Sequence, residues 1–410
     1  MTRFMPEKSA RHLRALVSAP ALADRQHVLV EAVDPAEAAQ APPRAEAVTG
    51  RLEAALFSVL EAAPADEVGD PREYRRALEI LLNRTRRTID KLDEAPGSRL
   101  TVDDARTLEA VIRADGTRPS LPVHDARVDP HHPLAGDWSA TLASTQDALA
   151  PSIRAIGRVE PEKPTARDYF GTAWIVDSAA GLALTNLHVV EVMRKRLPHL
   201  VQPSDSGFTV RGGVFVDFAV ESGRADKNRF RVVEAITPTT VDGPGFTRLD
   251  AAVLRLEPTA ESDPALPPAI PVTADPAGPA GNLASYCVVG FPGPPQFIGG
   301  IHEGIDWTWV NTTLFGNRYG IKRLAPGTTH RPLGTVDGDE QQWVFGHDLT
   351  TLGGNSGSPI LNWLDDSRRA FGLHFAGRSL DSNYAHAIGA CADQLRTMGV
   401  PVDDPHHHRP

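Results

Sequence analysis

Cysteine, long apolar runs and runs of like charge are all scarce in this chain of 410 residues. Its two cysteines are too few for a disulfide-stapled secreted domain or for a zinc site built from four cysteines. No apolar run approaches the roughly 18 residues that a membrane-spanning helix needs. The net charge is -10, but neither sign of charge gathers in a long run. We therefore expect neither a membrane-bound protein nor a nucleic-acid partner.

The few cysteines and the first residues bear on the compartment in which the protein works. We expect Cys287 and Cys391 to be buried free thiols, with a single disulfide between them as the alternative. Basic residues near the N-terminus precede an alanine-rich segment, 15–23, which Ser18 and Pro20 interrupt. This segment is weaker than the apolar core of a secretory signal, so we expect a cytoplasmic protein rather than an exported one.

The first 113 residues have the pattern of packed helices. From Leu52 to Ala63 apolar side chains recur at intervals of three and four, which predicts an amphipathic helix. A second helix is predicted to begin after Asp70 and to continue to Leu92. We expect a helical module over residues 1–113 that recruits, anchors or regulates the rest of the chain and binds a protein partner. Its helix pattern weakly resembles small adaptor domains.

Frequent prolines and short apolar runs mark the remainder of the chain. The prolines of residues 114–165 predict a connector with short extended pieces. Beyond it, short apolar runs alternate with glycine and proline turns, which predicts a β sandwich or a pair of β barrels. A terminal helix is expected over 391–398. The strands are expected at 172–176, 182–185, 214–220, 230–236, 251–256, 286–289, 307–310, 359–361 and 370–375.

Three short segments of this β-rich part carry reactive side chains in a suggestive order. His188 follows directly after a strand-like run, and Asp250 precedes a strongly apolar strand. Ser356 lies in the glycine-rich turn Gly353-Gly-Asn-Ser-Gly-Ser-Pro359, just before another apolar strand. Taken singly, the histidine and the aspartate are commonly structural, and the glycine-rich segment is commonly a tight turn.

Together these residues fit nucleophilic acyl transfer. A serine hydroxyl is a weak nucleophile until an imidazole takes its proton, which is the role expected of His188. Asp250 would hold the imidazole tautomer and stabilise the imidazolium. The glycines around Ser356 would let the amides of Gly354 and Ser356 converge on the oxyanion of a tetrahedral intermediate, where losing one donor costs about 3 kcal/mol of barrier.

The segments around these residues resemble motifs of the trypsin-fold (chymotrypsin-like) serine peptidases, particularly the bacterial members and the glutamyl endopeptidases among them. The resemblance runs from about Tyr169 to Ala390. The resembling motifs are Thr185-Asn-Leu-His188, Asp250-Ala-Ala-Val-Leu, Gly354-Asn-Ser356-Gly-Ser-Pro359, Gly372-Leu-His-Phe-Ala-Gly377 and Cys287-Val-Val-Gly-Phe-Pro-Gly293.

The resemblance implies a fold and an activity. The expected fold is multidomain: the α-helical module, then an all-β pair of antiparallel six-stranded barrels over 166–400 with a C-terminal helix, then a tail over 401–410. His188 and Asp250 would come from the first barrel and Ser356 from the second. The expected activity is a serine endopeptidase acting on proteins or peptides. The strand Phe375-Ala376-Gly377 would pair with the extended substrate backbone.

The resemblance also bears on activation and specificity. Asn355 stands where digestive trypsins have an aspartate that pairs with a newly cut amino terminus, so we expect no activation by that ion pair. Thr350 stands where trypsins have the aspartate that binds a basic side chain, which leaves lysine and arginine without a counter-charge. Thr351 and His374 match residues that bind a substrate carboxylate in glutamyl endopeptidases. The alternative is that His374 is a packed strand residue bonded to backbone.

Two other functions stay open at this point. One is a catalytically silent interaction protein on the same fold, and the other is an esterase using the same three residues, although no Gly-x-Ser-x-Gly elbow is present. The histidines at 131–132 and 406–408 lack an ordered carboxylate or cysteine partner, so we expect no metal site. No cofactor is expected.

Overall fold

The computed structural model describes a defined part of the chain. The described residues are Asn83, Arg87, 118–238, Phe246, 248–274, 285–295, 301–302, 305–336, 338–363, 369–378 and 382–403. The chain divides into two compact units. One unit consists of residues 122–128, 144–294 and 319–410 and contains both β barrels. The other consists of residues 1–121, 129–143 and 295–318.

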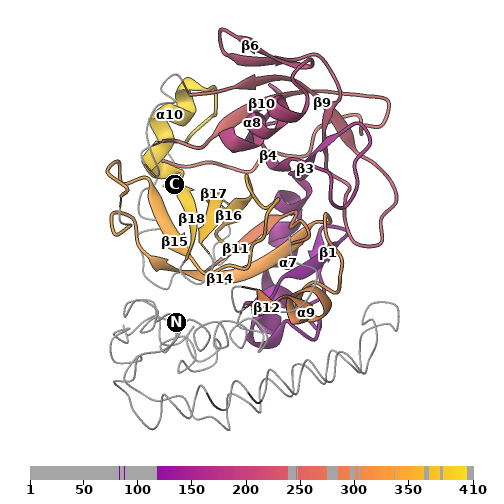
Figure 1. Ribbon diagram of the computed structural model, residues 1–410, viewed down its shortest axis with the longest axis vertical. Coiled ribbons are helices and arrows are strands. Elements are labelled where there is room, and N and C mark those ends of the chain that lie inside the picture. The colour runs from indigo at the N-terminus through magenta and orange to yellow at the C-terminus, as the bar shows by residue number, and fades with distance from the viewer. Residues whose placement is uncertain are drawn as a thin grey trace. The chain divides into compact units, whose positions relative to one another are not determined.

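The first barrel is a closed antiparallel sheet of six strands (Figure 1). Its order is β10-β5-β4-β3-β8-β9, and β9 pairs back onto β10. The hairpin of β6 (Val201–Ser204) and β7 (Gly207–Val210) extends the sheet beyond β9. The six strands are β3 (Ile156–Pro161), β4 (Gly171–Asp177), β5 (Leu182–Thr185), β8 (Val214–Asp217), β9 (Arg229–Ile236) and β10 (Ala252–Glu257).

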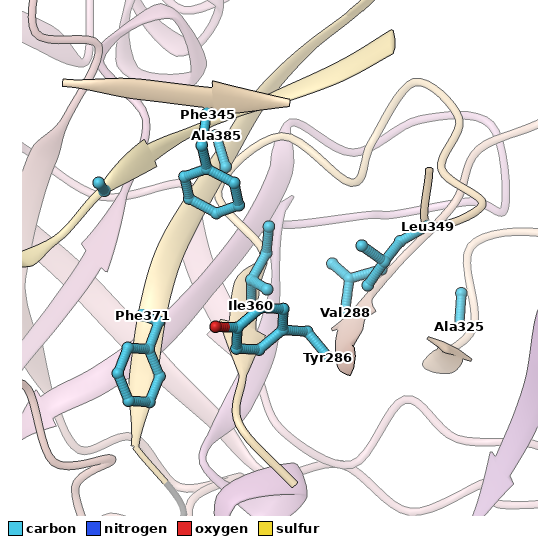
Figure 2. Close-up of a cluster of buried hydrophobic side chains, with 9 residues drawn as sticks. Tyr286, Val288, Ala325, Phe345, Leu349, Ile360, Phe371 and Ala385 are labelled. Carbon is cyan, nitrogen blue, oxygen red and sulfur yellow. The ribbon is translucent and has the colours of Figure 1, made fainter. Parts of the chain in front are cut away.

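The second barrel is built in the same way and closes where β11 pairs with β14. The hairpin of β1 (Leu121–His124) and β2 (Arg127–Val128) extends its sheet at β14. Figure 2 shows the cluster of buried apolar side chains in its interior, among them Tyr286, Ile360 and Phe371 from the neighbouring strands β11, β16 and β17. The six strands are β11 (Ser285–Gly290), β14 (Arg323–Arg331), β15 (Val344–His347), β16 (Pro359–Leu361), β17 (Ala370–Arg378) and β18 (Ser382–Ala387).

Short helices accompany the barrels. Helix α8 (Leu187–Arg196) follows β5 directly, and η5 (Gly389–Cys391) leads into α10 (Ala392–Thr397). The helix expected over 391–398 is therefore confirmed. None of the helices in the described ranges is long and apolar enough to cross a membrane.

The strand expected at 307–310 is wrong. The structure has a short helix, α9 (Trp307–Trp309), followed by a π-helical turn, η4 (Val310–Leu314). The side chain of Asn311 donates to the Trp307 carbonyl at 2.7 Å, and that of Thr312 donates to the Thr308 carbonyl at 2.8 Å. These bonds reach back four residues, so they favour a helical turn over the extended chain that the tryptophans alone suggest. Residues 307–314 belong to the unit without the barrels, which also contains η1 (Gly136–Trp138) and the short strand pair of β12 (Ile301–His302) and β13 (Ile305–Asp306).

The connector expected over 114–165 also needs correction. This segment contains helix α7 (Ser139–Arg154) and strand β3, which pairs with both β4 and β8 inside the first barrel. Its prolines do not interrupt these elements: Pro161 is the last residue of β3, and Pro151 lies inside α7, one turn before its end. The barrel domain therefore begins before residue 166, because β3 (Ile156–Pro161) is one of the strands of the first barrel.

Both cysteines are buried free thiols, as expected. Burial raises the pKa of each thiol, so neither is a reactive thiolate at neutral pH. The helical module expected over residues 1–113 lies outside the described residues except for Asn83 and Arg87, which are both helical.

Candidate active site

His188 lies in the first turn of α8, immediately after β5 ends. Asn186 occupies the N-cap position in an extended conformation, but its side chain does not cap the helix. Its amide donates instead to the Asp250 carbonyl at 2.7 Å. The antiparallel register pairs Ala252 with Thr185, so the segment before β10 runs alongside the beginning of α8. Pairing between neighbouring strands therefore brings Asp250 to His188.

Asp250 binds His188 at two points. One carboxylate oxygen, Oδ1, accepts the backbone N–H of His188 at 2.9 Å. The other, Oδ2, accepts the Nδ1–H of the imidazole at 2.5 Å. The Asp250 side chain is 18% exposed and that of His188 is 36% exposed. Because Nδ1 is bound to the carboxylate, Nε2 is the imidazole nitrogen left to exchange a proton elsewhere.

The environment of Asp250 favours its ionised form. Burial acts to raise the pKa of Asp250, but the hydrogen bonds and charge of His188 outweigh burial, and the pKa lies below the ordinary value of 3.8. The carboxylate is therefore charged at neutral pH. It orients the imidazole of His188, and its charge stabilises the protonated form of that imidazole.

A buried histidine of the second barrel contacts the same aspartate. The backbone N–H of Asp250 donates to Nε2 of His386 at 3.0 Å. His386 lies in β18 and its ring stacks on Phe375, with ring centroids 4.2 Å apart. Burial lowers the pKa of His386 to about 4, although the charge of Asp250 acts in the opposite direction. The ring is thus neutral at neutral pH and can accept the amide proton.

Ser356 lies in a segment of two consecutive tight turns. The N–H of Asn355 donates to the Leu352 carbonyl at 3.1 Å, and the N–H of Ser358 donates to the Asn355 carbonyl at 2.9 Å. The third residue of each turn is a glycine with positive φ, +93° at Gly354 and +90° at Gly357. Positive φ at this position is typical of turns that require glycine. The glycine-rich motif is therefore a conformational requirement of the segment that presents Ser356.

This double turn packs against the beginning of β4 in the first barrel. The Ser356 carbonyl accepts the N–H of Thr172 at 2.9 Å. A Cβ atom added at Gly171 would lie 3.0 Å from the Ser356 carbonyl oxygen and 2.8 Å from a methyl group of Val189. Since Val189 follows His188 in α8, Gly171 brings the backbone of Ser356 next to the helix turn that carries the histidine.

The amides of Gly354 and Ser356 are left available by this arrangement. Within the described part of the chain neither N–H donates to a protein acceptor. The Gly353 carbonyl accepts the N–H of Gly293 at 2.6 Å. Because a trans peptide directs its N–H opposite to its C=O, the Gly354 amide points away from Gly293. The geometry therefore leaves two neighbouring donors beside Ser356.

Comparison with known proteins supplies the family. Residues 171–368 match the model of the trypsin-like peptidase domain. A probable serine protease of Lysobacter enzymogenes is 36% identical over 398 residues, covering 97% of this chain and 100% of that protein. The chain belongs to the trypsin-like serine peptidases. It is a peptide hydrolase with the double barrel expected from its sequence.

Two solved structures with more distant similarity to this peptidase are also proteases. The Rv3671c protease of M. tuberculosis, in an inactive form, is 18% identical with a TM-score of 0.35, covering 62% of this chain and 92% of that chain. The VesB protease of Vibrio cholerae is 14% identical with a TM-score of 0.39, covering 59% of this chain and 63% of that chain.

His374 of the peptidase is buried in β17 beside the nucleophile segment. Its carbonyl accepts the N–H of Gly357, and its own N–H donates to the Ser358 carbonyl, both at 2.9 Å. Its ring Nδ1 lies 3.3 Å from Nε2 of His347. Burial lowers the pKa of His374 to about 3, with a further contribution from the charge of His188, while a hydrogen bond with the Tyr384 backbone acts in the opposite direction. The imidazole is therefore neutral at neutral pH, with hydrogen-bond partners inside the protein.

The residues after His374 become progressively more accessible. Phe375 and Ala376 are half-buried and Gly377 is exposed. On one side this segment pairs with β18, with a bulge between His374 and Ala376, whereas β16 pairs with β17 only as far as Leu373. Among the described strands none pairs with the other edge of 375–377, so that edge can accept an extended peptide.

The two threonines predicted to bind substrate lie just before the nucleophile turns. Thr350 is buried, whereas Thr351 is half-buried. The structure brings two further residues to this site, Thr172 and His386, which were not predicted from the sequence. No motif marks either of them, and their contacts with Gly354 and Asp250 span 182 and 136 positions of chain.

Among the described residues no cluster of histidine, cysteine, aspartate or glutamate could hold a metal ion.

Proposed function

We propose that the peptidase cleaves peptide bonds with Ser356 as nucleophile, His188 as general base and acid, and Asp250 as the residue that orients His188. The observation that supports this best is the double hydrogen bond between Asp250 and His188, through Nδ1 at 2.5 Å and the backbone N–H at 2.9 Å. A purely structural histidine needs no ionised carboxylate fixing both its ring and its backbone. The arrangement leaves Nε2 as the proton acceptor.

The proposed reaction proceeds in two halves. As the Ser356 Oγ bonds to the substrate carbonyl carbon, its proton passes to Nε2 of His188. The imidazolium, stabilised by Asp250, gives this proton to the leaving amine as the C–N bond breaks, which leaves an acyl-enzyme. Water then attacks the acyl carbon while His188 takes its proton. That proton returns to the Ser356 Oγ as the acid product leaves.

The amides of Gly354 and Ser356 are the proposed oxyanion donors. They lie within the two turns, next to the Gly353 and Asn355 carbonyls that accept the N–H groups of Gly293 and Ser358, and they have no protein acceptor within the described residues. Donors fixed before the reaction stabilise the developing negative charge without reorganising, which is the largest single term in many enzymes of this kind.

The proposed substrate contacts are the open edge of Phe375, Ala376 and Gly377 for the backbone, with Thr350, Thr351 and His374 near the side chain that precedes the cleaved bond. Because Thr350 offers no negative charge, we propose that this side chain is not lysine or arginine. A neutral His374 could only hydrogen-bond to a substrate carboxylate, so acidic specificity would rest on weak polar contacts.

A protein partner for residues 1–113 and a cytoplasmic location also stay predictions.

Labelling with a fluorophosphonate probe tests the assignment of the nucleophile. The wild-type protein is expected to be labelled at Ser356, and the Ser356→Ala protein is expected to remain unlabelled, because the probe requires an activated serine hydroxyl. Labelling that persists in Ser356→Ala would identify another nucleophile. A folded wild type that takes no label would favour a catalytically silent interaction protein.

Digestion of a peptide library tests the proposed specificity. Wild-type protein is expected to cleave few bonds after lysine or arginine, because Thr350 has no carboxylate to pair with a basic side chain. The Ser356→Ala protein, which should cleave nothing, provides the background. A profile dominated by cleavage after basic residues would contradict the role assigned to Thr350.

A further inference from the structure

Thr172 forms an unusually complete set of hydrogen bonds for one buried threonine. It is the second residue of β4 and is fully buried. Its Oγ1 donates to the Gly354 carbonyl at 2.9 Å and accepts the N–H of Phe291 at 3.3 Å. Its backbone N–H donates to the Ser356 carbonyl at 2.9 Å, and its own carbonyl accepts the Thr185 hydroxyl at 2.7 Å. A residue of the first barrel thus contacts both proposed oxyanion-binding residues.

Two hydrogen bonds, one from Gly293 and one from Thr172, hold the peptide groups on either side of Gly354. The preceding peptide is held by its carbonyl, which accepts the N–H of Gly293, and the following peptide is held by the Thr172 hydroxyl. Glycine has no Cβ to restrict its rotation, so without such bonds the Gly354 amide has no fixed direction. The hydroxyl of Thr172 is the only side-chain partner of this carbonyl among the described residues.

Neighbouring groups leave little room for another arrangement. A Cβ atom added at Gly354 would lie 2.5 Å from both the Phe291 carbonyl oxygen and the Tyr169 hydroxyl. The Tyr169 hydroxyl itself donates to the Phe291 carbonyl at 2.7 Å. The segment at Phe291 is therefore tied to Tyr169 and Thr172, and it in turn packs against Gly354.

We propose that Thr172 is a positioning residue whose hydroxyl keeps the Gly354 amide directed at the oxyanion, so that the uncleaved chain is competent without a newly cut amino terminus. This inference rests on the proposed function of Ser356 and Gly354. It gives a physical reason why Asn355, buried and uncharged, can replace an acidic residue at that position. The ordering that an ion pair would supply comes instead from a hydroxyl on the opposite barrel.

Two substitutions of Thr172 separate the effect of its hydroxyl from the effect of its branched side-chain shape. Thr172→Val keeps the branched side chain and removes the hydroxyl, whereas Thr172→Ser keeps the hydroxyl. We expect Thr172→Val to lower kcat about tenfold or more, less than the roughly hundredfold loss from removing an oxyanion donor outright, with KM nearly unchanged. Affinity for a peptide boronic acid, whose tetrahedral oxygen occupies the oxyanion position, should fall in parallel. Thr172→Ser should restore both to within about threefold of wild type.

Thr185→Val provides the matched control. It removes a buried hydroxyl that also bonds to Thr172, at the carbonyl rather than at the side chain, and it is expected to lower thermal stability without the loss in kcat. If Thr172→Val fails to fold, Thr172→Cys replaces the hydroxyl with a weak S–H donor and should give a kcat between those of the serine variant and the Ser356→Ala background.

The outcomes are distinguishable. Absence of fluorophosphonate labelling in folded wild type, or labelling that persists in Ser356→Ala, overturns the proposed function. If wild type is labelled, the role of Thr172 is tested by comparing kcat and boronic acid affinity between wild type and folded Thr172→Val. Where Thr172→Val does not fold, Thr172→Cys takes its place in this comparison. Equal values in the two proteins overturn that role. Labelling of wild type only after its N-terminal residues are cleaved also overturns it. Labelling of the intact chain, together with loss in Thr172→Val and recovery in Thr172→Ser, supports it.

Discussion

The charge state of each site residue follows from its immediate surroundings. Asp250 keeps its charge because His188 donates to both of its carboxylate oxygens. His374 and His386 are fully enclosed by protein, and burial holds both rings neutral at neutral pH. His188 differs from both, because its side chain is 36% exposed.

The two buried histidines should make folding stability depend on pH. Their pKa values in the folded protein lie near 3 and 4, against 6.5 in the unfolded chain, so below about pH 6.5 the unfolded state binds protons that the folded state does not. Stability should therefore fall as pH drops from 6.5 to 4, by about 1.4 kcal/mol per pH unit for each histidine. Asp250 adds acid sensitivity below about pH 4, because its lowered pKa contributes stability only while it is ionised.

Thermal or urea unfolding at a series of pH values measures this dependence. His386→Phe keeps an aromatic ring against Phe375 and removes one titrating group, so it should reduce the slope of stability against pH between 4 and 6.5 whatever its effect at pH 7. An identical slope in the two proteins would show that His386 does not remain neutral when folded.

The residues of the proposed triad were predictable because each lies in a local pattern. His188 follows a strand, Asp250 precedes one, and Ser356 lies among glycines that the turns require. Thr172 and His386 were not predictable, since a buried threonine in a strand and a buried histidine in another are common in any β protein. Their roles come from partners far away in the chain.

At the scale of single elements, the double turn around Ser356 depends on the third residue of each turn, Gly354 in the first and Gly357 in the second. Gly357 has a φ of +90°, and a Cβ added there would lie 2.1 Å from the Thr172 carbonyl oxygen. Gly353 differs, because an added Cβ would have nothing within 4 Å. The two glycines of one segment thus offer a direct comparison between a required glycine and a replaceable one.

Gly357→Ala is expected to destabilise the protein by about 2 kcal/mol or more, because strain at positive φ adds to the collision with the backbone of β4. Gly353→Ala is expected to change stability by no more than about 0.5 kcal/mol. Denaturant unfolding of both variants checks this. Equal stabilities for the two would contradict the conformation assigned to the turn.

Most strands of the two barrels were predictable from sequence, but β3, β14, β15 and β18 were not predicted. Strands β4, β5, β11 and β16 lie where apolar runs between turns placed them. The segment at 307–310 has equally apolar residues but forms a helical turn, since Asn311 and Thr312 bond back to it. Side chains that bond to the backbone locally can override a pattern of apolar residues.

At the scale of the barrel-containing unit, segments before residue 166 are part of the fold. Strand β3 completes the first barrel between β4 and β8. The hairpin β1–β2 is joined to the barrels through a buried ion pair: Glu221 accepts the N–H of Ala126 at 2.9 Å and the ammonium of Lys322 at 3.0 Å. Removing β3 opens the first barrel, and removing the hairpin takes one hydrogen bond from the buried carboxylate of Glu221, so both losses are costly.

Shortened chains test where the folded domain begins. A chain of residues 166–410 lacks β3 and α7, so we expect it to aggregate or to unfold without a cooperative transition. A chain of residues 118–410 keeps every described strand and should unfold cooperatively and take the fluorophosphonate label. Circular dichroism during thermal unfolding, with labelling of the same samples, measures both. Cooperative unfolding of the 166–410 chain would contradict the place given to β3.

The sequence by itself determined the class of fold, the order of the three reactive residues and the turns that need glycine, because these follow from local patterns of apolar and turn-forming residues. Only the tertiary structure decided that Asp250 binds His188 at two atoms, that His374 is a neutral buried ring, and that Thr172 bonds to the carbonyls of Gly354 and Ser356. Those facts depend on strand register and on packing between barrels, which bring together residues that no short stretch of sequence contains.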